Sequence, residues 1–558
     1  MNLIGNINAI PFRRFRGGGG VAPFPSIPGM IARYSASGLT NEQMAANPVW
    51  VDKTGNGHDL QMKNFFWGGM SGVGGYVQNF NYFRNNTTVD KVRIDEQSSN
   101  SIKVTLLTSG IGHAIYIPKD IYQFNKSYFI KISSEGYNEG DLFLSFYAPF
   151  TSTATTVKVP LNSNGITEIP AIKEDDFLAV YLFNAAGKVG SITIEQLPLY
   201  PGALVFDGVD DYGVCDNFPI LTKEKGYTVV ALRQWITYNP NAISAIATNA
   251  SDQSFNGAFT FENYNKGAEQ TISYGATQIT LQYSKSPFSW QTTYKYNGVN
   301  IANGNKDATN SLVLGRSYPQ RNEFANFAIW ELVFLDHDAT EEELTKIKDY
   351  FVKTYPWLFP DQAWTVTGKT NEDEDRATIA NITGNGNDLV LSNFGFIEGS
   401  GYNEEGEYAG YLVTDGVDDK VQSYRFTMNE DWTIVGDWEL LSNVQINCGI
   451  VKAQNVYLYN VANGLLISIN NPRSLQRFGT KSLHVICSDG RLYDRNWVEY
   501  EYTVDQNFAI VESSLNIGFN LNNYTQIAFK NLGIYNNQIL SKDDCIKAYN
   551  YLQTLKAK

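Results

Sequence analysis

The chain has 558 residues, a net charge of −14, and a composition that is 14% aromatic and 18% charged. A chain of this length is too long to fold around a single hydrophobic core, which predicts three or four domains. The abundance of Tyr and Gly argues against an all-α protein and against a disordered one. The negative charge disfavours nucleic acid as the main partner, and without a run of about 18 apolar residues no membrane-spanning helix is expected.

Residues 1–28 predict an extended arm. The segment holds the glycines 17–20, four prolines and three arginines but no acidic residue, so it cannot bury a core. A cluster of guanidinium groups and rings is suited to docking into an acidic groove of a protein partner, and a solvated tail is the alternative. This cluster comprises Phe12, Arg13, Arg14, Phe15 and Arg16. The start of the chain does not resemble a secretory signal.

The rest of the chain contains an internal repeat. Residues 54–60 (Thr-Gly-Asn-Gly-His-Asp-Leu) return at 383–389, shifted by 329, whereas residues 207–211 (Asp-Gly-Val-Asp-Asp) return at 415–419, shifted by 208. The difference, 329 − 208 = 121 residues, indicates an insert in the first copy. We expect a first module at 29–75 plus 200–357, the insert at 76–199, and a second module at 358–558.

The insert predicts a small antiparallel β-sandwich. Apolar residues alternate with polar ones at 102–106, 130–132 and 192–194, and turn signals recur at short intervals. We describe it as similar to a carbohydrate-binding module, with its entry and exit close together.

Within each module, a strand leads through an Asp-Gly turn into a second strand, which predicts a β-hairpin at 204–214. Each module also ends with a strand and a capped helix. Thr340 and Glu343 form a capping box before the first helix, and Ser541 precedes the second, with Asp544 three residues later.

The ordered set of motifs, present twice, resembles the laminin-G-like, concanavalin A-like lectin jelly-roll family. The motifs are the turn at 54–60, Phe-Asp-Gly-x-x-Asp at 206–211, Tyr-Thr-Val at 227–229, Leu-Gly at 314–315 and the capped helix. The resemblance implies an all-β protein with two jelly-roll sandwiches, the first interrupted by a smaller β-sandwich and preceded by the arm, and often a role in binding glycans or proteins. The second copy departs at Thr414, where the first has Phe206.

The layout of a basic arm followed by such modules resembles head or tail fibres of phages that infect Bacteroidales, including the crAss-like group. That resemblance implies localisation in the virion, with the arm docked to a capsid or tail protein, a homo-trimer, and contact with host glycans. The alternatives are a bacterial surface glycan-binding adhesin or a polysaccharide-degrading enzyme.

Two aspartate groups are candidate Ca²⁺ ligands, since some members of this fold bind that ion through carboxylates. They comprise Asp207, Asp210 and Asp211 in the first module, and Asp415, Asp418 and Asp419 in the second. The alternative, which we favour, is that these residues build the turn and cap its backbone N–H groups. No other cofactor is expected.

Catalytic motifs are missing from the sequence. The Glu-x-Asp-x-Glu pattern of glucanases with this fold is absent, and the four histidines are isolated, so we expect no enzyme. Trp67, Trp290 and Trp497 lie near Gly- or Asn-rich turns and are candidates for a glycan platform, although a core position is the more frequent role of Trp in a sandwich. The four cysteines (Cys215, Cys448, Cys487 and Cys545) are expected to be free buried thiols.

Overall fold

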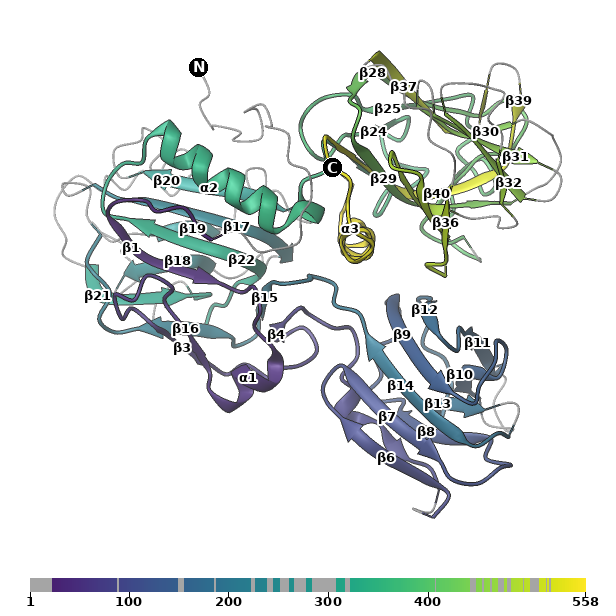
Figure 1. The fold of residues 1–558 in the computed structure, drawn as a ribbon, viewed down its shortest axis with the longest axis horizontal. Coiled ribbons are helices and arrows are strands. Elements are labelled where there is room, and N and C mark those ends of the chain that lie inside the picture. Colours follow the sequence, from purple (N-terminus) through teal and green to yellow (C-terminus); the bar gives the residue numbers. More distant parts are fainter. Residues whose placement is uncertain are drawn as a thin grey trace. The chain divides into compact units, whose positions relative to one another are not determined.

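The computed structural model describes residues 23–87, 90–148, 155–184, 187–221, 226–237, 244–250, 260–264, 277–283, 308–316, 322–406, 408–441, 448–453, 456–461, 464–469, 476–478, 483–494, 496–501, 511–517, 519–520 and 523–557. The predicted docking cluster of the arm and Trp290 lie outside these ranges. The chain forms two compact units, Ile27–Ala339, and Thr340–Lys558 together with Met1–Ser26. All pairings between the named strands are antiparallel, and the predicted all-β class is confirmed (Figure 1).

The first jelly roll consists of two six-stranded sheets. One has the order β20-β17-β22-β15-β4, with β1 also paired to β22, and the other has the order β19-β18-β21-β16-β3-β2. The strands of the first sheet are β1 (Met30–Ser35), β4 (Gly72–Val73), β15 (Leu204–Asp207), β17 (Thr228–Thr237), β20 (Gln278–Tyr283) and β22 (Asn326–Leu335). Those of the second are β2 (Val49–Trp50), β3 (Leu60–Lys63), β16 (Tyr212–Cys215), β18 (Ser244–Ala250), β19 (Thr260–Tyr264) and β21 (Ala308–Leu314).

The second jelly roll consists of two eight-stranded sheets, with the orders β26-β27-β40-β29-β34-β35-β36 (and β23 on β40) and β24-β25-β28-β37-β30-β31-β32-β33. The first contains β23 (Gln362–Thr365), β26 (Gly401–Tyr402), β27 (Leu412–Val413), β29 (Trp432–Leu440), β34 (Leu483–Cys487), β35 (Arg491–Asp494), β36 (Glu499–Glu501) and β40 (Ile527–Asn536). The second contains β24 (Thr378–Ile379), β25 (Leu389–Ser392), β28 (Lys420–Met428), β30 (Cys448–Ala453), β31 (Val456–Val461), β32 (Gly464–Ile469), β33 (Gln476–Phe478) and β37 (Val511–Ile517). A separate pair consists of β38 (Phe519–Asn520) and β39 (Asn523–Tyr524).

The two jelly rolls share one topology. In the first, β4-β15-β22-β17-β20 are neighbours and β1 is added to β22; in the second, β26-β27-β40-β29-β34 are neighbours and β23 is added to β40. The opposite sheets match in the same way over six strands each. The sequence repeat is therefore a structural repeat, and among the described strands each sheet of the second copy has two more than its counterpart.

The predicted hairpin at 204–214 is wrong. β15 pairs with β22 and β4, whereas β16 pairs with β21 and β3, so the two strands lie in opposite sheets. The Asp-Gly turn is an arch that carries the chain from one sheet of the sandwich to the other. The second copy repeats this arrangement between β27 and β28. The Asp-Gly turn determines only that the chain reverses direction. Which strands pair is decided by burial, because β15 and β16 are each buried in a different sheet of the sandwich.

The insert is a sandwich of two five-stranded sheets. Their orders are β11-β10-β13-β8-β5 and β12-β9-β14-β7-β6. The first contains β5 (Arg84–Asn85), β8 (His113–Pro118), β10 (Leu142–Tyr147), β11 (Val157–Leu161) and β13 (Ala179–Asn184). The second contains β6 (Val92–Gln97), β7 (Ser101–Leu106), β9 (Tyr128–Glu135), β12 (Gly165–Ile169) and β14 (Gly190–Gln196), and a 3-10 turn, η2 (Phe80–Tyr82), precedes β5.

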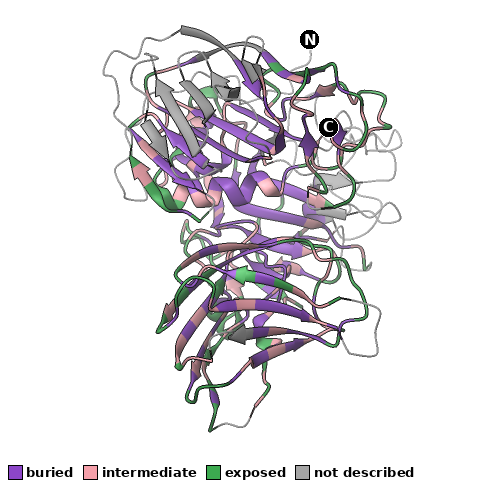
Figure 2. Cartoon of the chain, turned by 90° about the vertical axis from the view of Figure 1, so that its right-hand side faces the viewer, coloured by how far each residue is buried: buried purple, intermediate pink, exposed green. Residues whose placement is uncertain are grey.

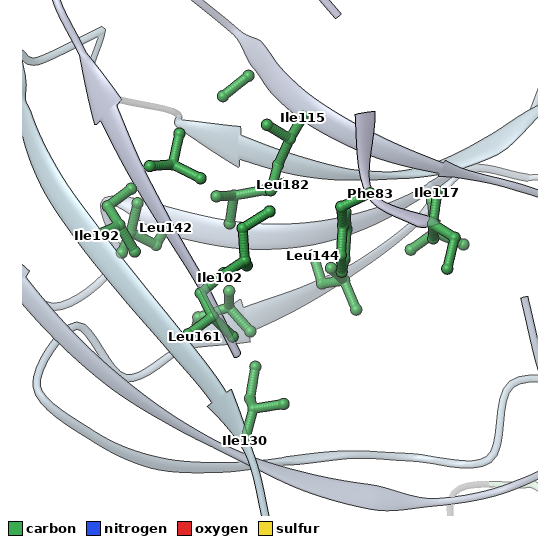
Figure 3. Close-up of a cluster of buried hydrophobic side chains, with 14 of the residues drawn as sticks. Phe83, Ile102, Ile115, Ile117, Ile130, Leu142, Leu144, Leu161, Leu182 and Ile192 are labelled. Atoms are coloured by element: carbon green, nitrogen blue, oxygen red, sulfur yellow. The ribbon is translucent and has the colours of Figure 1, made fainter. Parts of the chain in front are cut away.

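The core of the insert lies between these sheets. Ile115, Leu144 and Leu182 of one sheet and Ile102 and Ile192 of the other are buried there (Figure 3). Buried and partly exposed residues alternate along β7, and along β8 from Ile115 to Pro118, as the sequence predicts for a sandwich with one dry and one wet face per sheet (Figure 2).

The insert enters and leaves the first jelly roll at one point. The Leu199 N–H donates to the Gly75 carbonyl and the Tyr200 N–H donates to the Gly74 carbonyl, at 2.9 and 2.8 Å. The two connecting segments therefore run side by side and leave the strand order of the host sandwich intact.

Short helices complete the fold: α1 (Asn41–Ala46), α2 (Glu341–Thr354), the 3-10 turn η3 (Pro356–Leu358) and α3 (Lys542–Gln553). The Thr340–Glu343 capping box is present, and Ser541 accepts from the Asp544 N–H. α3 packs on β29 and β40 of the second jelly roll. At the described end of the arm, the Phe24 ring packs edge-on against Tyr350 of α2, with 4.8 Å between the ring centroids. No helix among the described residues is long and apolar enough to cross a membrane.

Candidate functional site

The first aspartate group closes the arch between β15 and β16. The Asp207 carboxylate accepts the N–H groups of Val209 (2.7 Å) and Asp210 (3.4 Å). The Asp211 carboxylate accepts the Asp207 N–H on one oxygen (2.9 Å) and the Ser71 hydroxyl on the other (2.9 Å). Gly208 adopts a φ of +77°, which a side chain would disfavour. Each of these groups therefore has a structural task in the turn.

The second aspartate group repeats these contacts. The Asp415 carboxylate accepts the Val417 and Asp418 N–H groups, and the Asp419 carboxylate accepts the Asp415 N–H and the Ser400 hydroxyl. The hydrogen-bond pattern, and not only the sequence, is thus conserved between the two copies. This agreement favours the turn-building interpretation of both groups.

Burial changes the acidity of the innermost carboxyl groups. Burial, and then the neighbouring Asp207 carboxylate, raise the pKa of Asp211 to about 8. Burial raises the pKa of Asp419 to about 6, and its backbone and Ser400 hydrogen bonds oppose that shift. At neutral pH the Asp211 carboxyl is therefore largely protonated, which lowers its strength as a cation ligand.

The donor set of each group still suits a hard cation by type. Within each group, one carboxylate oxygen from each of the three aspartates lies within 4.8 Å of the other two. Among the residues that the structure describes, these are the sole clusters of three His, Cys, Asp or Glu residues that meet this spacing. A Ca²⁺ ion bound by Asp211 or Asp419 would have to share an oxygen that already accepts a backbone N–H or a serine hydroxyl, so Ca²⁺ binding stays a prediction to test.

An exposed apolar tip accompanies each arch. Val209 is 71% exposed and Val417 is 70% exposed. A second loop lies against each arch through Asn64, whose amide donates to the Asp210 carbonyl, and Asn393, whose amide donates to the Asp418 carbonyl, both at 3.1 Å. These loops also present an exposed apolar residue each, Phe66 (59%) and Ile397 (64%). Both modules therefore hold two apolar side chains outward on hydrogen-bonded loops.

The two tryptophan candidates that the structure describes differ in burial. Trp497 is buried and packs against Tyr493 and Tyr549. Trp67 is half-buried and stacks on Phe65, with 4.7 Å between the centroids. Trp290 lies outside the described residues. Trp497 therefore follows the core interpretation, whereas half-buried Trp67 packs against the edge of the core of the first jelly roll.

Other predicted features also have structural partners. Three of the four cysteines, Cys215, Cys487 and Cys545, are buried thiols that form no disulfide, as expected. Thr414, which replaces Phe206, is buried; its hydroxyl donates to the Thr525 carbonyl (2.8 Å) and accepts the Ile527 N–H (3.0 Å). The polar side chain is thus accommodated by backbone groups.

An aromatic surface on the insert was not anticipated. Four rings gather on the sheet that contains β8, β10 and β13, and we call them the tyrosine face: His113, Tyr116, Tyr147 and Tyr181. Tyr181 is central, with ring centroids 4.6 Å from His113, 5.7 Å from Tyr116 and 5.9 Å from Tyr147. All four are half-buried. The sequence does contain an indication of this cluster: aromatic residues stand at solvent-facing positions of several strands. They come together only when those strands pair in the sheet.

Burial perturbs the titration of two groups on this face. Burial, followed by Tyr116 and Tyr147, raises the pKa of Tyr181. Burial, followed by the Lys158 charge, lowers the pKa of His113. His113 is therefore neutral at neutral pH and offers one donor and one acceptor nitrogen.

Comparisons with known proteins give no assignment. Neither a protein-family model nor a curated protein matches the chain. Among solved structures, Trypanosoma rangeli sialidase aligns at 9% identity over 85% of this chain and 94% of that one, with a TM-score of 0.25. A mutant of that sialidase displaying trans-sialidase activity aligns at 11% identity over 41% of each chain, with a TM-score of 0.23, so less than half of it is covered. The N-terminal CBM22-1-CBM22-2 tandem domain from Paenibacillus barcinonensis Xyn10C aligns at 10% identity over 48% of this chain and 97% of that one, with a TM-score of 0.16. TM-scores this low carry no argument about this chain.

Proposed function

We propose that the chain is a non-enzymatic adhesive protein of a phage particle. Its arm, residues 1–28, docks to a capsid or tail protein, and its β-sandwiches contact glycans or another component of the host surface. In this proposal the particle carries the chain as a homo-trimer.

The observation that carries the adhesive role is the duplicated apolar tip. The same pair of loops holds two exposed apolar side chains outward in both jelly rolls, Val209 and Phe66 in the first and Val417 and Ile397 in the second, and we assign these side chains to contact with a partner. The loops are fixed by internal hydrogen bonds, as a preorganised contact surface requires. By contrast, the carboxylates next to them are used to hold the turn.

The virion assignment is supported by the arm. Its Arg and Phe residues suit a protein groove, and the first described ring after them, Phe24, packs on α2.

The test is immunogold electron microscopy of purified phage particles with antibody raised against the full chain. Regular labelling at the head or tail is expected, with loss of labelling for particles that carry a chain lacking residues 1–22. Unlabelled particles beside labelled bacterial envelopes would overturn the virion assignment in favour of an envelope adhesin. Release of reducing sugar from host polysaccharide by the purified chain would overturn the non-enzymatic assignment.

A further inference from the structure

We propose that the tyrosine face of the insert is a binding site for an acidic polysaccharide chain. This inference deepens the proposed function, on whose adhesive role it rests, by assigning the glycan contact to one face and the ligand to one chemical class. It does not depend on where the chain is located.

The register of the sheet fixes which way these residues face. Ile115, Leu144 and Leu182 lie in the core between the two sheets (Figure 3). Successive residues of a strand point to opposite faces, so their neighbours Tyr116, Ser145 and Tyr181 face away from that core. His113 faces the same way because the register shifts between Leu182 and Phe183, and its ring contacts Tyr181. The tyrosine face is thus the outer surface of the sheet β11-β10-β13-β8-β5.

The rings form a shallow platform with a wall. The His113 and Tyr116 rings are tilted by 36° and 34° from the Tyr181 ring. The Tyr147 ring stands at 90° to Tyr181 and at 68° to His113. The apolar C–H face of a pyranose ring fits against such a platform, and tyrosine and histidine edges supply hydrogen bonds to its hydroxyl groups.

Two cations end the central row of this face. Directly paired positions run across the five strands in the order Arg84, Tyr116, Tyr181, Ser145, Lys158. Arg84 and Lys158 are exposed, and four strand spacings separate them, or about 19 Å. The row contains no acid, although the chain as a whole carries a net charge of −14. Two cations in a row without an acid favour a ligand with carboxylate or sulfate groups.

Ser145 provides a second and independent indication of a polar ligand. It is 1% exposed, it lies directly opposite Tyr181, and its hydroxyl has no hydrogen-bond partner among the described residues. Polar groups buried without a partner are rare in folded proteins. A sugar hydroxyl that reaches between the rings would pair with it and orient the chain.

Single-stranded nucleic acid also combines stacking with negative charge, but it fits this face less well. Its binding sites place cations along the whole backbone track, whereas the central row has one at each end.

The experiment is binding of the purified full-length chain to an array of neutral, carboxylated and sulfated glycans, with a dT oligonucleotide as a further probe. Acidic glycans are expected to bind, and rising salt should weaken the binding. Tyr181→Ala is expected to weaken it by about tenfold, from the loss of stacking. Tyr181→Ala also removes packing, so a second variant is measured beside it. This double variant, Arg84→Glu with Lys158→Glu, reverses both charges and keeps all four rings. It should bind acidic glycans at least as weakly as Tyr181→Ala.

The matched control is Lys131→Glu, an exposed lysine on β9 in the opposite sheet of the insert. It should bind like the unmodified chain. The proposal is overturned by a failure to bind any acidic glycan, by binding that the double variant leaves unchanged, or by preference for the oligonucleotide. The array and the labelling experiment test different claims, because the array uses the purified protein. If the chain binds acidic glycans but the antibody leaves phage particles unlabelled, only the virion assignment is overturned.

Discussion

The side-chain amide of Gln196 hydrogen-bonds to both backbone groups of Gln78, 118 positions earlier in the chain. Its oxygen accepts the Gln78 N–H and its nitrogen donates to the Gln78 carbonyl, each at 2.9 Å, and both residues are buried. The Gln78 side chain makes the same two-bond contact with the backbone of Gln123. These amides replace strand pairing where the chain enters and leaves the insert.

Gln196→Ala should open the base of the insert. The change leaves a buried N–H and a buried C=O without partners, at a cost of about 2–4 kcal/mol. Hydrogen exchange followed by mass spectrometry should show faster exchange in peptides that cover residues 76–82 and 194–200. Gln123→Ala is the control, because that side chain is exposed and makes one long local bond (3.4 Å). Equal exchange in the two variants would contradict the role of Gln196.

The pH dependence of the first jelly roll should follow Asp211. In the unfolded chain an Asp ionises near pH ~3.9, whereas burial keeps the Asp211 carboxyl protonated up to about pH 8. The folded state therefore binds the extra proton between these values, and its stability falls as pH rises through that window and then levels off. Asp211→Asn should remove this fall. Calorimetric melting from pH 4 to pH 9 measures it, with exposed Asp210→Asn as the control.

The equivalent change in the second copy should act over a narrower window. Asp419 ionises at about pH 6 in the folded protein, so Asp419→Asn should alter the slope only below that pH. If Asp419→Asn still changed the slope of melting temperature against pH between pH 7 and pH 8, ionisation of Asp419 at about pH 6 would be contradicted.

Removal of calcium should leave the melting temperature unchanged. Backbone N–H groups and the Ser71 and Ser400 hydroxyls already satisfy the aspartate carboxylates that close the arches. Melting curves in EDTA and in added CaCl₂ should therefore superimpose. A rise in melting temperature with Ca²⁺ that disappears in the Asp210→Asn, Asp418→Asn double variant would establish a metal site instead.

Glu331→Gln should strongly destabilise the first jelly roll. The Glu331 carboxylate is fully buried and accepts two bonds from the Arg33 guanidinium (3.1 Å each) and one from the Ser35 hydroxyl (2.7 Å). Removal of the charge leaves a largely buried guanidinium without its counter-ion, at a cost of about 3–5 kcal/mol. Chemical denaturation measures it. The control, Glu342→Gln, breaks the exposed pair with Lys346 and should cost less than about 0.5 kcal/mol.

Asn531→Leu should stabilise the second jelly roll. The register of β23 on β40 places Asn531 where the first copy has Glu331, but neither amide atom has a hydrogen-bond partner among the described residues and the side chain is fully buried. Its replacement by an apolar residue of similar size removes an unpaired donor and acceptor, a gain of about 1–2 kcal/mol. A lower denaturation midpoint for the variant would show that the amide is paired after all.

The repeat predicted much of the fold because it compares the chain with itself. The shared turn at 54–60 and 383–389 is built by equivalent contacts: Thr54 bonds to the Asp52 carboxylate and Thr383 to the Asn381 amide oxygen. Local sequence was sufficient there, since the partners are two residues apart. It was also sufficient for the helix caps at Thr340 and Ser541.

Local sequence failed where strand partners are distant. The residues of 204–214 form two strands and a turn as predicted, but the turn joins two sheets, because β15 and β16 find their partners at 326–329 and 312–314. The tryptophans near turns were plausible glycan candidates by position, and only packing shows that Trp497 is buried against Tyr549.

The sequence by itself determined the all-β class, the duplicated module, the insert and the residues that build each arch, because periodicity and turn chemistry act over a few residues. Tertiary structure alone decided which strands pair, which carboxyl is buried enough to stay protonated at neutral pH, and which rings meet. Tyr116, Tyr147 and Tyr181 are up to 65 positions apart in the printed sequence. They meet because β8, β10 and β13 are neighbours in one sheet, and that pairing depends on burial of the opposite face.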